Sequence, residues 1–121
     1  PALLAVMDRI AAECEATVRD WAAAWTAKDL ARYLGFYSTA FKPERSSESN
    51  WKVLRAQRLK KPSIEVRVSQ LSTTEQDASH CAVSFKQQYR SSDFSDDTVK
   101  TLSLRKEGKD WRILSERVSK P

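Results

Sequence analysis

Residues 21–41 read WAAAWTAKDLARYLGFYSTAF and carry aromatic side chains at intervals of four residues. The series consists of Trp21, Trp25, Tyr33, Tyr37 and Phe41, and Asp29 occupies its one position that is not aromatic. A four-residue step keeps side chains on one face of a helix, so the stretch predicts helices with an aromatic face. We interpret this aromatic ladder as the packing seam between helices and a sheet. A stacking wall for a ligand is the alternative.

The apolar spacing continues toward the N-terminus and predicts a long helix over residues 2–25. Its apolar stripe is made of Leu3, Met7, Ile10, Cys14, Val18, Trp21 and Trp25. Thr26 is expected to cap a second helix, over residues 27–34, by accepting a backbone N–H near Asp29. Gly35 follows this helix and suits the left-handed conformation in which many helices end.

The pattern beyond Gly35 predicts a third helix and then a sheet. Residues 36–41 are expected to form a strand or an extended turn, and residues 48–59 a helix that starts after Ser46-Ser47. Alternating apolar positions then predict four antiparallel strands, over residues 64–69, 81–89, 98–106 and 111–118. Their connections are expected to be a polar turn at 72–79, a polar loop at 91–97 and a hairpin turn around Gly108. Helices followed by strands indicate an α+β fold, with helices covering one face of a sheet.

Composition limits the classes of protein that fit. The chain has 121 residues, a formal net charge of +5, 40% hydrophobic residues and 31% charged residues. This size and balance predict one folded domain over residues 1–121 and exclude a disordered tail. Two glycines are too few for a Rossmann turn or a P-loop, and two cysteines are too few for a cysteine zinc site. We therefore predict no metal and no cofactor, and the lack of a long apolar run predicts no transmembrane segment.

The ladder Trp21-x3-Trp25-x3-Asp29-x3-Tyr33-x3-Tyr37-Ser38 is followed by Trp51-x3-Arg55, and the chain closes with GKDWRI at residues 108–113. This combination resembles the nuclear transport factor 2-like superfamily, which includes ketosteroid isomerases and polyketide cyclases. Within the superfamily, the pattern is most similar to the C-terminal domains of bacterial L,D-transpeptidase-type and tetratricopeptide-repeat envelope proteins.

The resemblance implies an α+β cone, in which three N-terminal helices pack on a curved, mainly antiparallel sheet of four to five strands. It also implies a pocket at the open end of the cone, a homodimer formed through the sheet, and a location in the periplasm or cell envelope. Pro1 is not a start methionine and no signal-peptide pattern follows it, so we expect the domain to be excised from a longer protein.

One region of the chain departs from the pattern of the catalytic members of the superfamily. Superfamily enzymes place an Asp or His acid–base group inside the cone, but residues 37–43, YSTAFKP, contain no acid where a ketosteroid isomerase carries one. The single histidine, His80, falls on the opposite side of its strand from Cys81. We therefore predict no catalytic residue and a non-catalytic ligand-binding or dimerisation and assembly domain of an envelope protein. A small cyclase, isomerase or dehydratase is the alternative, and an unpaired Glu116 or Asp29 facing the cavity would favour it.

Aromatic and cationic side chains form the candidate binding site. The predicted ligand-binding residues are Tyr37, Trp51, Arg55, Arg58, Tyr89 and Lys100. Arginine and lysine fit carboxylates or phosphates, and tryptophan and tyrosine fit rings or sugar faces, so the expected ligand is a small anionic or glycan-related group. In the alternative interpretation, Trp51 belongs to the core and Arg55 pairs with an internal carboxylate such as Glu116.

The whole charge excess lies in residues 42–67, where eight Lys and Arg residues accompany three Glu residues. We interpret this segment as a solvated face, with polyanion binding as the alternative. Nucleic acid is not an expected partner, because no recognition motif accompanies the charge. Asp93, Asp96 and Asp97 lack the regular spacing and closing Glu of a calcium loop and are interpreted as a solvated turn.

Cys14 and Cys81 each lie on an apolar face of their predicted element. We interpret them as two buried free thiols. The alternative is a disulfide, formed in an oxidising compartment where the long helix crosses the sheet.

Overall fold

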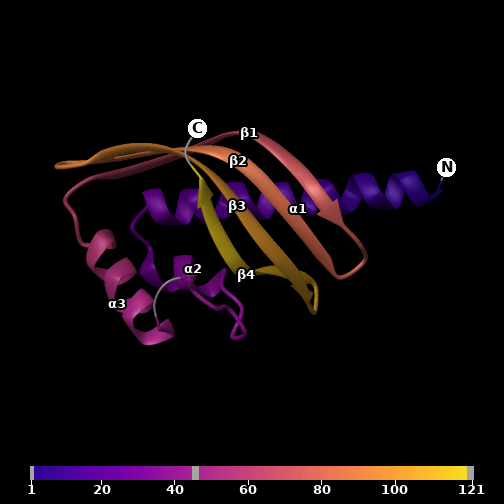
Figure 1. The fold of residues 1–121 in the computed structure, drawn as a ribbon, viewed down its shortest axis with the longest axis horizontal. Coiled ribbons are helices and arrows are strands. Elements are labelled where there is room, and N and C mark those ends of the chain that lie inside the picture. Colours follow the sequence, from indigo (N-terminus) through magenta and orange to yellow (C-terminus); the bar gives the residue numbers. More distant parts are fainter. Residues whose placement is uncertain (1, 45–46, 120–121) are drawn as a thin grey trace.

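A computed structural model describes residues 2–44 and 47–119 of the chain, and the predicted Ser46 helix start and Arg45 of the basic segment lie outside these residues. The described elements are α1 (Ala2–Thr26), α2 (Leu30–Gly35), α3 (Glu48–Leu59), β1 (Ile64–Gln76), β2 (His80–Ser91), β3 (Ser95–Glu107) and β4 (Asp110–Ser119). The strands form one antiparallel sheet in the order β1-β2-β3-β4. The sheet curves over α1, and α2 and α3 lie at one end of it (Figure 1). The predicted α+β cone is confirmed.

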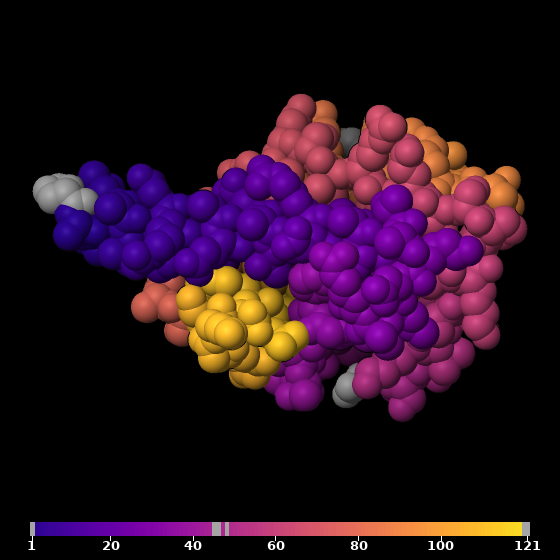
Figure 2. Space-filling model, turned by 180° about the vertical axis from the view of Figure 1, so that it is seen from behind, coloured from indigo at the N-terminus to yellow at the C-terminus, as the bar shows by residue number. Residues whose placement is uncertain are grey.

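The core lies between α1 and the concave face of the sheet. The apolar stripe of α1 is buried from Cys14 to Trp25, as predicted. Its N-terminal end extends beyond the sheet (Figures 1 and 2), and Leu3 there is 72% exposed. Alternate residues of β2 face α1, because successive side chains of a strand point to opposite faces. None of the described helices combines the length and the apolarity that crossing a membrane requires.

The connection between α1 and α2 differs from the prediction. The Thr26 hydroxyl does not cap α2: it accepts the Val66 N–H at 2.9 Å and donates to the Val66 carbonyl at 3.3 Å, which ties the end of α1 to β1. Asp29 caps α2 instead, and its carboxylate accepts the Arg32 N–H at 3.1 Å. The prediction of a left-handed conformation at Gly35 is also wrong. Gly35 is the last residue of the helix and does not have a positive φ.

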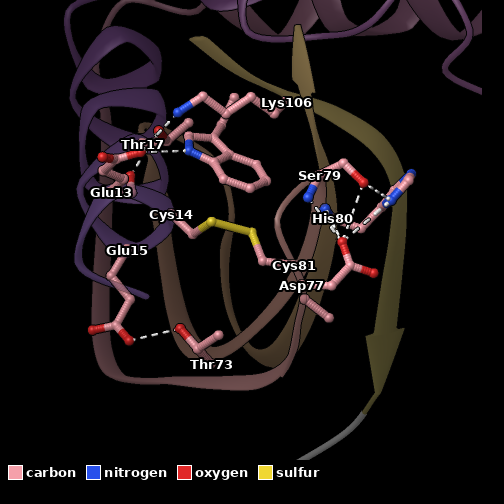
Figure 3. The surroundings of a disulfide bond; sticks show 12 residues. Glu13, Cys14, Glu15, Thr17, Thr73, Asp77, Ser79, His80, Cys81 and Lys106 are labelled. Carbon is pink, nitrogen blue, oxygen red and sulfur yellow. Dashed lines mark hydrogen bonds and ion pairs between the residues drawn. A yellow bond between two sulfur atoms is a disulfide. The ribbon is translucent and has the colours of Figure 1, made fainter. Parts of the chain in front are cut away.

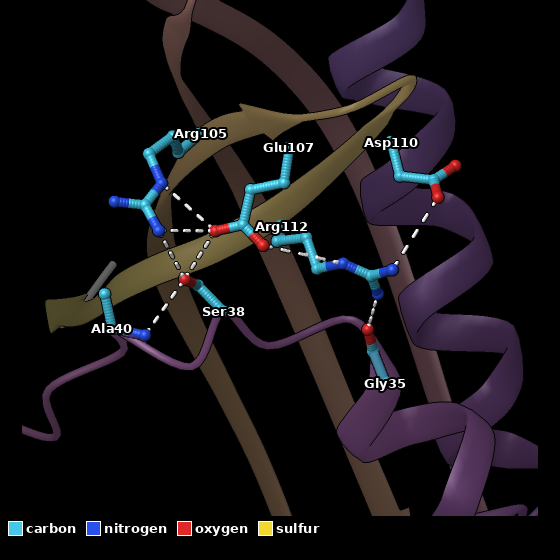
Figure 4. Close-up of polar contacts among 7 residues, drawn as sticks. All are labelled: Gly35, Ser38, Ala40, Arg105, Glu107, Asp110 and Arg112. Atoms are coloured by element: carbon cyan, nitrogen blue, oxygen red, sulfur yellow. Dashed lines mark hydrogen bonds and ion pairs between the residues drawn. The ribbon is translucent and has the colours of Figure 1, made fainter.

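The segment after α2 is extended and lies against the hairpin of β3 and β4 (Figure 4). Tyr37 forms a single bridge with Ile113, in which the Ser38 N–H donates to the Ile113 carbonyl at 2.9 Å. The Ser38 hydroxyl donates to Glu107 at 2.6 Å and accepts from Arg105 at 3.1 Å. These bonds fix the direction in which Tyr37 enters the core.

The strands are longer than predicted. The expected polar turn at 72–79 is mostly strand, because β1 continues to Gln76 after a bulge at Gln70, whose φ is 53°. Pairing with β2 supplies backbone partners to these polar residues, which is why weak apolar alternation does not end the strand. The expected loop at 91–97 is shorter for the same reason, since β3 begins at Ser95. The hairpin at Gly108 is confirmed, with a φ of 65°.

Cys14 and Cys81 form a disulfide, so the interpretation as free thiols is wrong (Figure 3). Both are almost fully buried, and they join α1 to β2 across 67 residues of sequence. Polar contacts flank the bond: Glu13 accepts from the Trp111 indole N–H at 3.0 Å and from Lys106 at 3.2 Å. The disulfide therefore fastens α1 to the sheet near the middle of the helix.

Replacing both cysteines by serine is expected to lower the free energy of unfolding by about 4 kcal/mol, because the bond closes a long loop in the unfolded chain. Urea unfolding of the wild-type and Cys14→Ser/Cys81→Ser proteins measures the difference. With excess reductant the difference is expected to shrink to the effect of the serines alone. Equal free energies of unfolding of the two proteins without reductant would contradict the presence of a stabilising disulfide.

Candidate functional site

Glu116 on β4 lies in the interior of the cone and is shared by two cations. Its Oε2 is 3.1 Å from Arg55 Nη2 on α3 and 3.5 Å from Lys100 Nζ on β3. The side chains are nearly enclosed, with exposed fractions of 8% for Glu116, 12% for Arg55 and 3% for Lys100. We refer to these three residues as the buried charge cluster.

A bulge aims Glu116 inward. Along β4, Trp111 and Ile113 are buried at odd positions, and strict alternation would place residue 116 on the opposite face. The register shifts between Ser103 and Leu104, so that Ser103 pairs with Ser115 and Leu104 with Ile113. The extra residue reverses the phase of the strand and brings Glu116 to the concave face.

Tyrosines complete the hydrogen bonds of the buried charge cluster. Tyr37 donates its hydroxyl proton to Glu116 Oε1, and Arg55 Nη1 donates to the Tyr33 hydroxyl at 2.7 Å. The two hydroxyls are 3.1 Å apart, and the Trp21 indole N–H donates to that of Tyr37 at 3.0 Å. Burial raises the pKa of Tyr33 to about 12 and raises the pKa of Tyr37 well above its ordinary value. Both phenols therefore stay neutral donors at physiological pH.

The three charged groups respond differently to burial. Burial alone would raise the pKa of Glu116, but Lys100 and Arg55 hold it below its ordinary value, so the carboxylate stays ionised. Burial opposes the charge of Arg55 too, yet its pKa is raised by Tyr33 and Glu116. Lys100 is the exception. Burial lowers its pKa to about 8, and Arg55 also lowers it, although Glu116 acts in the opposite direction.

A cavity of about 440 Å³ opens beside the cluster, between α1, α3 and the concave ends of β2 and β3. We call it the cone cavity, and its lining includes Trp25, Arg55, Arg58, Lys61, Gln87, Tyr89, Phe94, Asp96 and Lys100. Three of the residues that line it each carry a buried polar atom without a hydrogen-bond partner among the described residues: Trp25 Nε1, Gln87 Oε1 and the Tyr89 hydroxyl. Buried polar atoms without partners are costly, so each of these atoms is expected to form a hydrogen bond with a water molecule or with a ligand.

The cone cavity brings together four of the six predicted ligand-binding residues: Arg55, Arg58, Tyr89 and Lys100. Tyr37 and Trp51 line a separate, smaller pocket of about 260 Å³. Their rings pack at 4.5 Å, so Trp51 belongs to the core, as the alternative interpretation has it. The same interpretation pairs Arg55 with Glu116, and the structure contains that ion pair.

Sequence reasoning did not select Trp25 and Gln87 for the site. Trp25 belongs to the aromatic ladder, which packs as a seam: its ring is 5.3 Å from Trp21 and 5.5 Å from Tyr33. Lys100 Nζ lies 5.3 Å from the centroid of the Trp25 ring, and Trp25 lines the cone cavity, so the seam also forms one wall of the cavity. Gln87 could have been identified from the sequence, because it is a polar residue at an inward-facing position of a strand whose other inward-facing side chains are apolar or aromatic.

The remaining candidates are occupied by contacts within the chain. Asp93 pairs with Lys61 at 2.9 Å and Asp97 with Arg90 at 2.9 Å. Within residues 2–44 and 47–119, no group of three His, Cys, Asp or Glu residues is placed to hold a metal ion. A larger groove of about 740 Å³ lies between α1, α2 and the β3–β4 hairpin, but none of the orphaned polar atoms of the described residues lines it.

Glu116→Gln is expected to lower the free energy of unfolding by about 3–5 kcal/mol, because it leaves two buried cations without their carboxylate. Thermal or urea unfolding at pH 7 measures the loss. The matched control is Glu65→Gln, which breaks an exposed pair with Arg67 and is expected to cost less than about 1 kcal/mol. Equal losses in both variants would contradict the buried geometry.

Comparison with known proteins places this architecture in a family. The model of the Cds6 C-terminal NTF2-like (nuclear transport factor 2-like) domain matches residues 13–117. Bd1075 of Bdellovibrio bacteriovorus is similar to the chain, with 26% identity and a TM-score of 0.80, over 89% of this chain and 39% of that one. A K307A mutant of Pgp2, a helical cell shape determining protein from Campylobacter jejuni, has 20% identity and a TM-score of 0.75, over 84% and 38% of the two chains.

A third similar structure has a different description. It is a putative dehydratase of the NTF2-like family from Streptomyces avermitilis, with 11% identity and a TM-score of 0.80, covering 94% of this chain and 97% of that one. By contrast, the chain spans less than half the length of Bd1075 and of Pgp2. The search of curated proteins found no match. Because the family model covers most of the chain, the protein belongs to the Cds6 C-terminal NTF2-like domain family.

Proposed function

We propose that this chain is a non-catalytic domain, part of a longer bacterial cell-envelope protein, that binds a small anionic or glycan-related group in the cone cavity. The observation that carries the proposal is a cavity lined by four cationic side chains and by three residues that each carry an orphaned buried polar atom. The orphaned atoms call for a polar ligand, and the cations favour a negative charge on it.

The lining suits a ring that bears a carboxylate. Trp25, Tyr89 and Phe94 offer aromatic surface for the face of a ring. Arg58 is exposed at the edge of the cavity and has no ion pair among the residues that the structure describes, so its guanidinium is available to a carboxylate.

Two observations support a location in the cell envelope. The Cys14–Cys81 disulfide fits an oxidising compartment such as the periplasm. Pgp2, which is described as a cell shape determining protein, contains a region of the same fold. Residues 1–121 are proposed to form one accessory domain there. Homodimerisation through the sheet stays a prediction of the family resemblance.

The enzyme alternative receives less support from the site. It requires an acid that faces the cavity without a partner. Glu116 is held by Arg55, Lys100 and Tyr37, and Asp29 caps α2. Asp96 also lines the cavity, but it is exposed to solvent rather than enclosed in the cone. The likeness to a putative dehydratase, at 11% identity, concerns the fold.

N-acetylmuramic acid is expected to bind the protein more tightly than N-acetylglucosamine, because it carries a lactyl ether with a carboxylate that N-acetylglucosamine lacks. Nuclear magnetic resonance titration at pH 7 measures both affinities and locates the shifted resonances. Arg58→Gln is expected to weaken binding of the acid about 10-fold, since it removes a charge-assisted hydrogen bond.

Arg117→Gln is the matched control, because Arg117 is exposed on the outer face of β4 and does not line the cavity. Its affinity is expected to equal that of the wild type. Equal binding of the two sugars, or shifts confined to residues outside the cone cavity, would contradict the proposed function.

A further inference from the structure

Lys100 meets charged groups from several elements of the cone. Glu116 on β4 is the one carboxylate of the described residues within ion-pair distance of it. Arg55 and Arg58 on α3 both act on it as cations, while Tyr89 on β2 and Asp96 on its own strand line the same cavity. From α1 it meets only indole rings, Trp21 at 5.2 Å and Trp25 at 5.3 Å, which do not titrate.

The charges in and around the cone cavity do not balance. Four cations, Arg55, Arg58, Lys61 and Lys100, accompany three carboxylates, Glu116, Asp93 and Asp96. In the enclosed part the imbalance is sharper, because Arg55 and Lys100 share the single carboxylate of Glu116. An uncompensated buried charge is unfavourable, and a protein relieves it by releasing a proton or by binding a counter-ion.

Lys100 is the group that can relieve the imbalance. Arg55 keeps its proton at every physiological pH, and Glu116 stays ionised between its two cations. The ammonium of Lys100 is therefore the one charge of the cluster that is lost within an accessible pH range, and its pKa of about 8 is consistent with that.

We propose that a singly charged anionic group enters the cone cavity as the missing counter-ion and that its binding is coupled to protonation of Lys100. The inference rests on the proposed function and deepens it by fixing the charge of the ligand. One negative charge balances the cluster with Lys100 protonated, whereas a dianion would leave an excess of negative charge in the same enclosed space.

The sign of the pH dependence follows from this coupling. Below pH 7 Lys100 is already protonated in the free protein, so affinity for the anion does not change with pH. A bound anion favours the ammonium and raises the pKa of Lys100, so the complex takes up a proton at pH 8 and above. The dissociation constant is expected to rise by about 10-fold per pH unit from pH 8.5 to 10.

The test is a titration with N-acetylmuramic acid from pH 6 to 10 on protein labelled with ¹³C at the lysine side chains. The Cε resonance of Lys100, assigned by its loss in Lys100→Met, reports the pKa with and without the acid. We expect the pKa to rise on binding and Lys100→Met to bind weakly at every pH. Lys100→Arg keeps the charge without titrating, so its affinity is expected to be constant from pH 6 to 10.

Lys86→Met is the matched control, because Lys86 is an exposed lysine on the outer face of β2, and its pH profile is expected to match the wild type. Binding of the acid with a pH-independent affinity would overturn the coupling and leave the proposed function standing. Failure of the acid to bind at 50 mM at any pH would overturn both. Equal binding of a sugar phosphate dianion and the monoanion at pH 8 would overturn the single-charge assignment alone.

Discussion

The carboxylate of Glu116 lies inside the cone and contacts Arg55 and Lys100 at once. Such a group is tolerated in a protein interior only when its oxygens are satisfied and its charge is paired. The surrounding elements supply what it needs: α3 brings Arg55, β3 brings Lys100, and the extended segment after α2 brings Tyr37. The bulge in β4 turns the carboxylate toward all of them.

The long helix gives this cluster its apolar surroundings. Trp21 and Trp25 lie over Lys100, and their rings exclude water from its ammonium. Two attachments hold that part of α1 in place, the disulfide from Cys14 to Cys81 and the paired hydrogen bonds between Thr26 and Val66. The same side chains therefore pack the core and set the protonation of the site, which is why the aromatic ladder serves both as a seam and as a cavity wall.

Much of the fold can be predicted from the local spacing of apolar residues, because helices and strands require different spacings and this sequence follows both. The aromatic residues Trp21, Trp25 and Tyr33 and the alternate residues of β2 follow such patterns, and both sets are buried as predicted. The site is harder to predict, because it depends on departures from pattern. The bulges at Gln70 and in β4 change which face a residue occupies, and the disulfide depends on where α1 crosses β2. Local periodicity also does not reveal that Tyr37 and Trp51 line one pocket while Arg58 and Tyr89 line another.

We propose that the buried charge cluster serves binding rather than stability. The most direct measurement compares the wild type with the variant Arg55→Met/Lys100→Met/Glu116→Leu, in urea unfolding and in titration with N-acetylmuramic acid. The free energy of unfolding of the variant is expected to lie within about 1 kcal/mol of the wild-type value or above it, because well-packed apolar side chains of similar volume can replace a buried ion cluster without a loss of stability. Binding of the acid is expected to disappear. A variant that unfolds more easily by several kcal/mol, or that still binds the acid with wild-type affinity, would contradict the proposal.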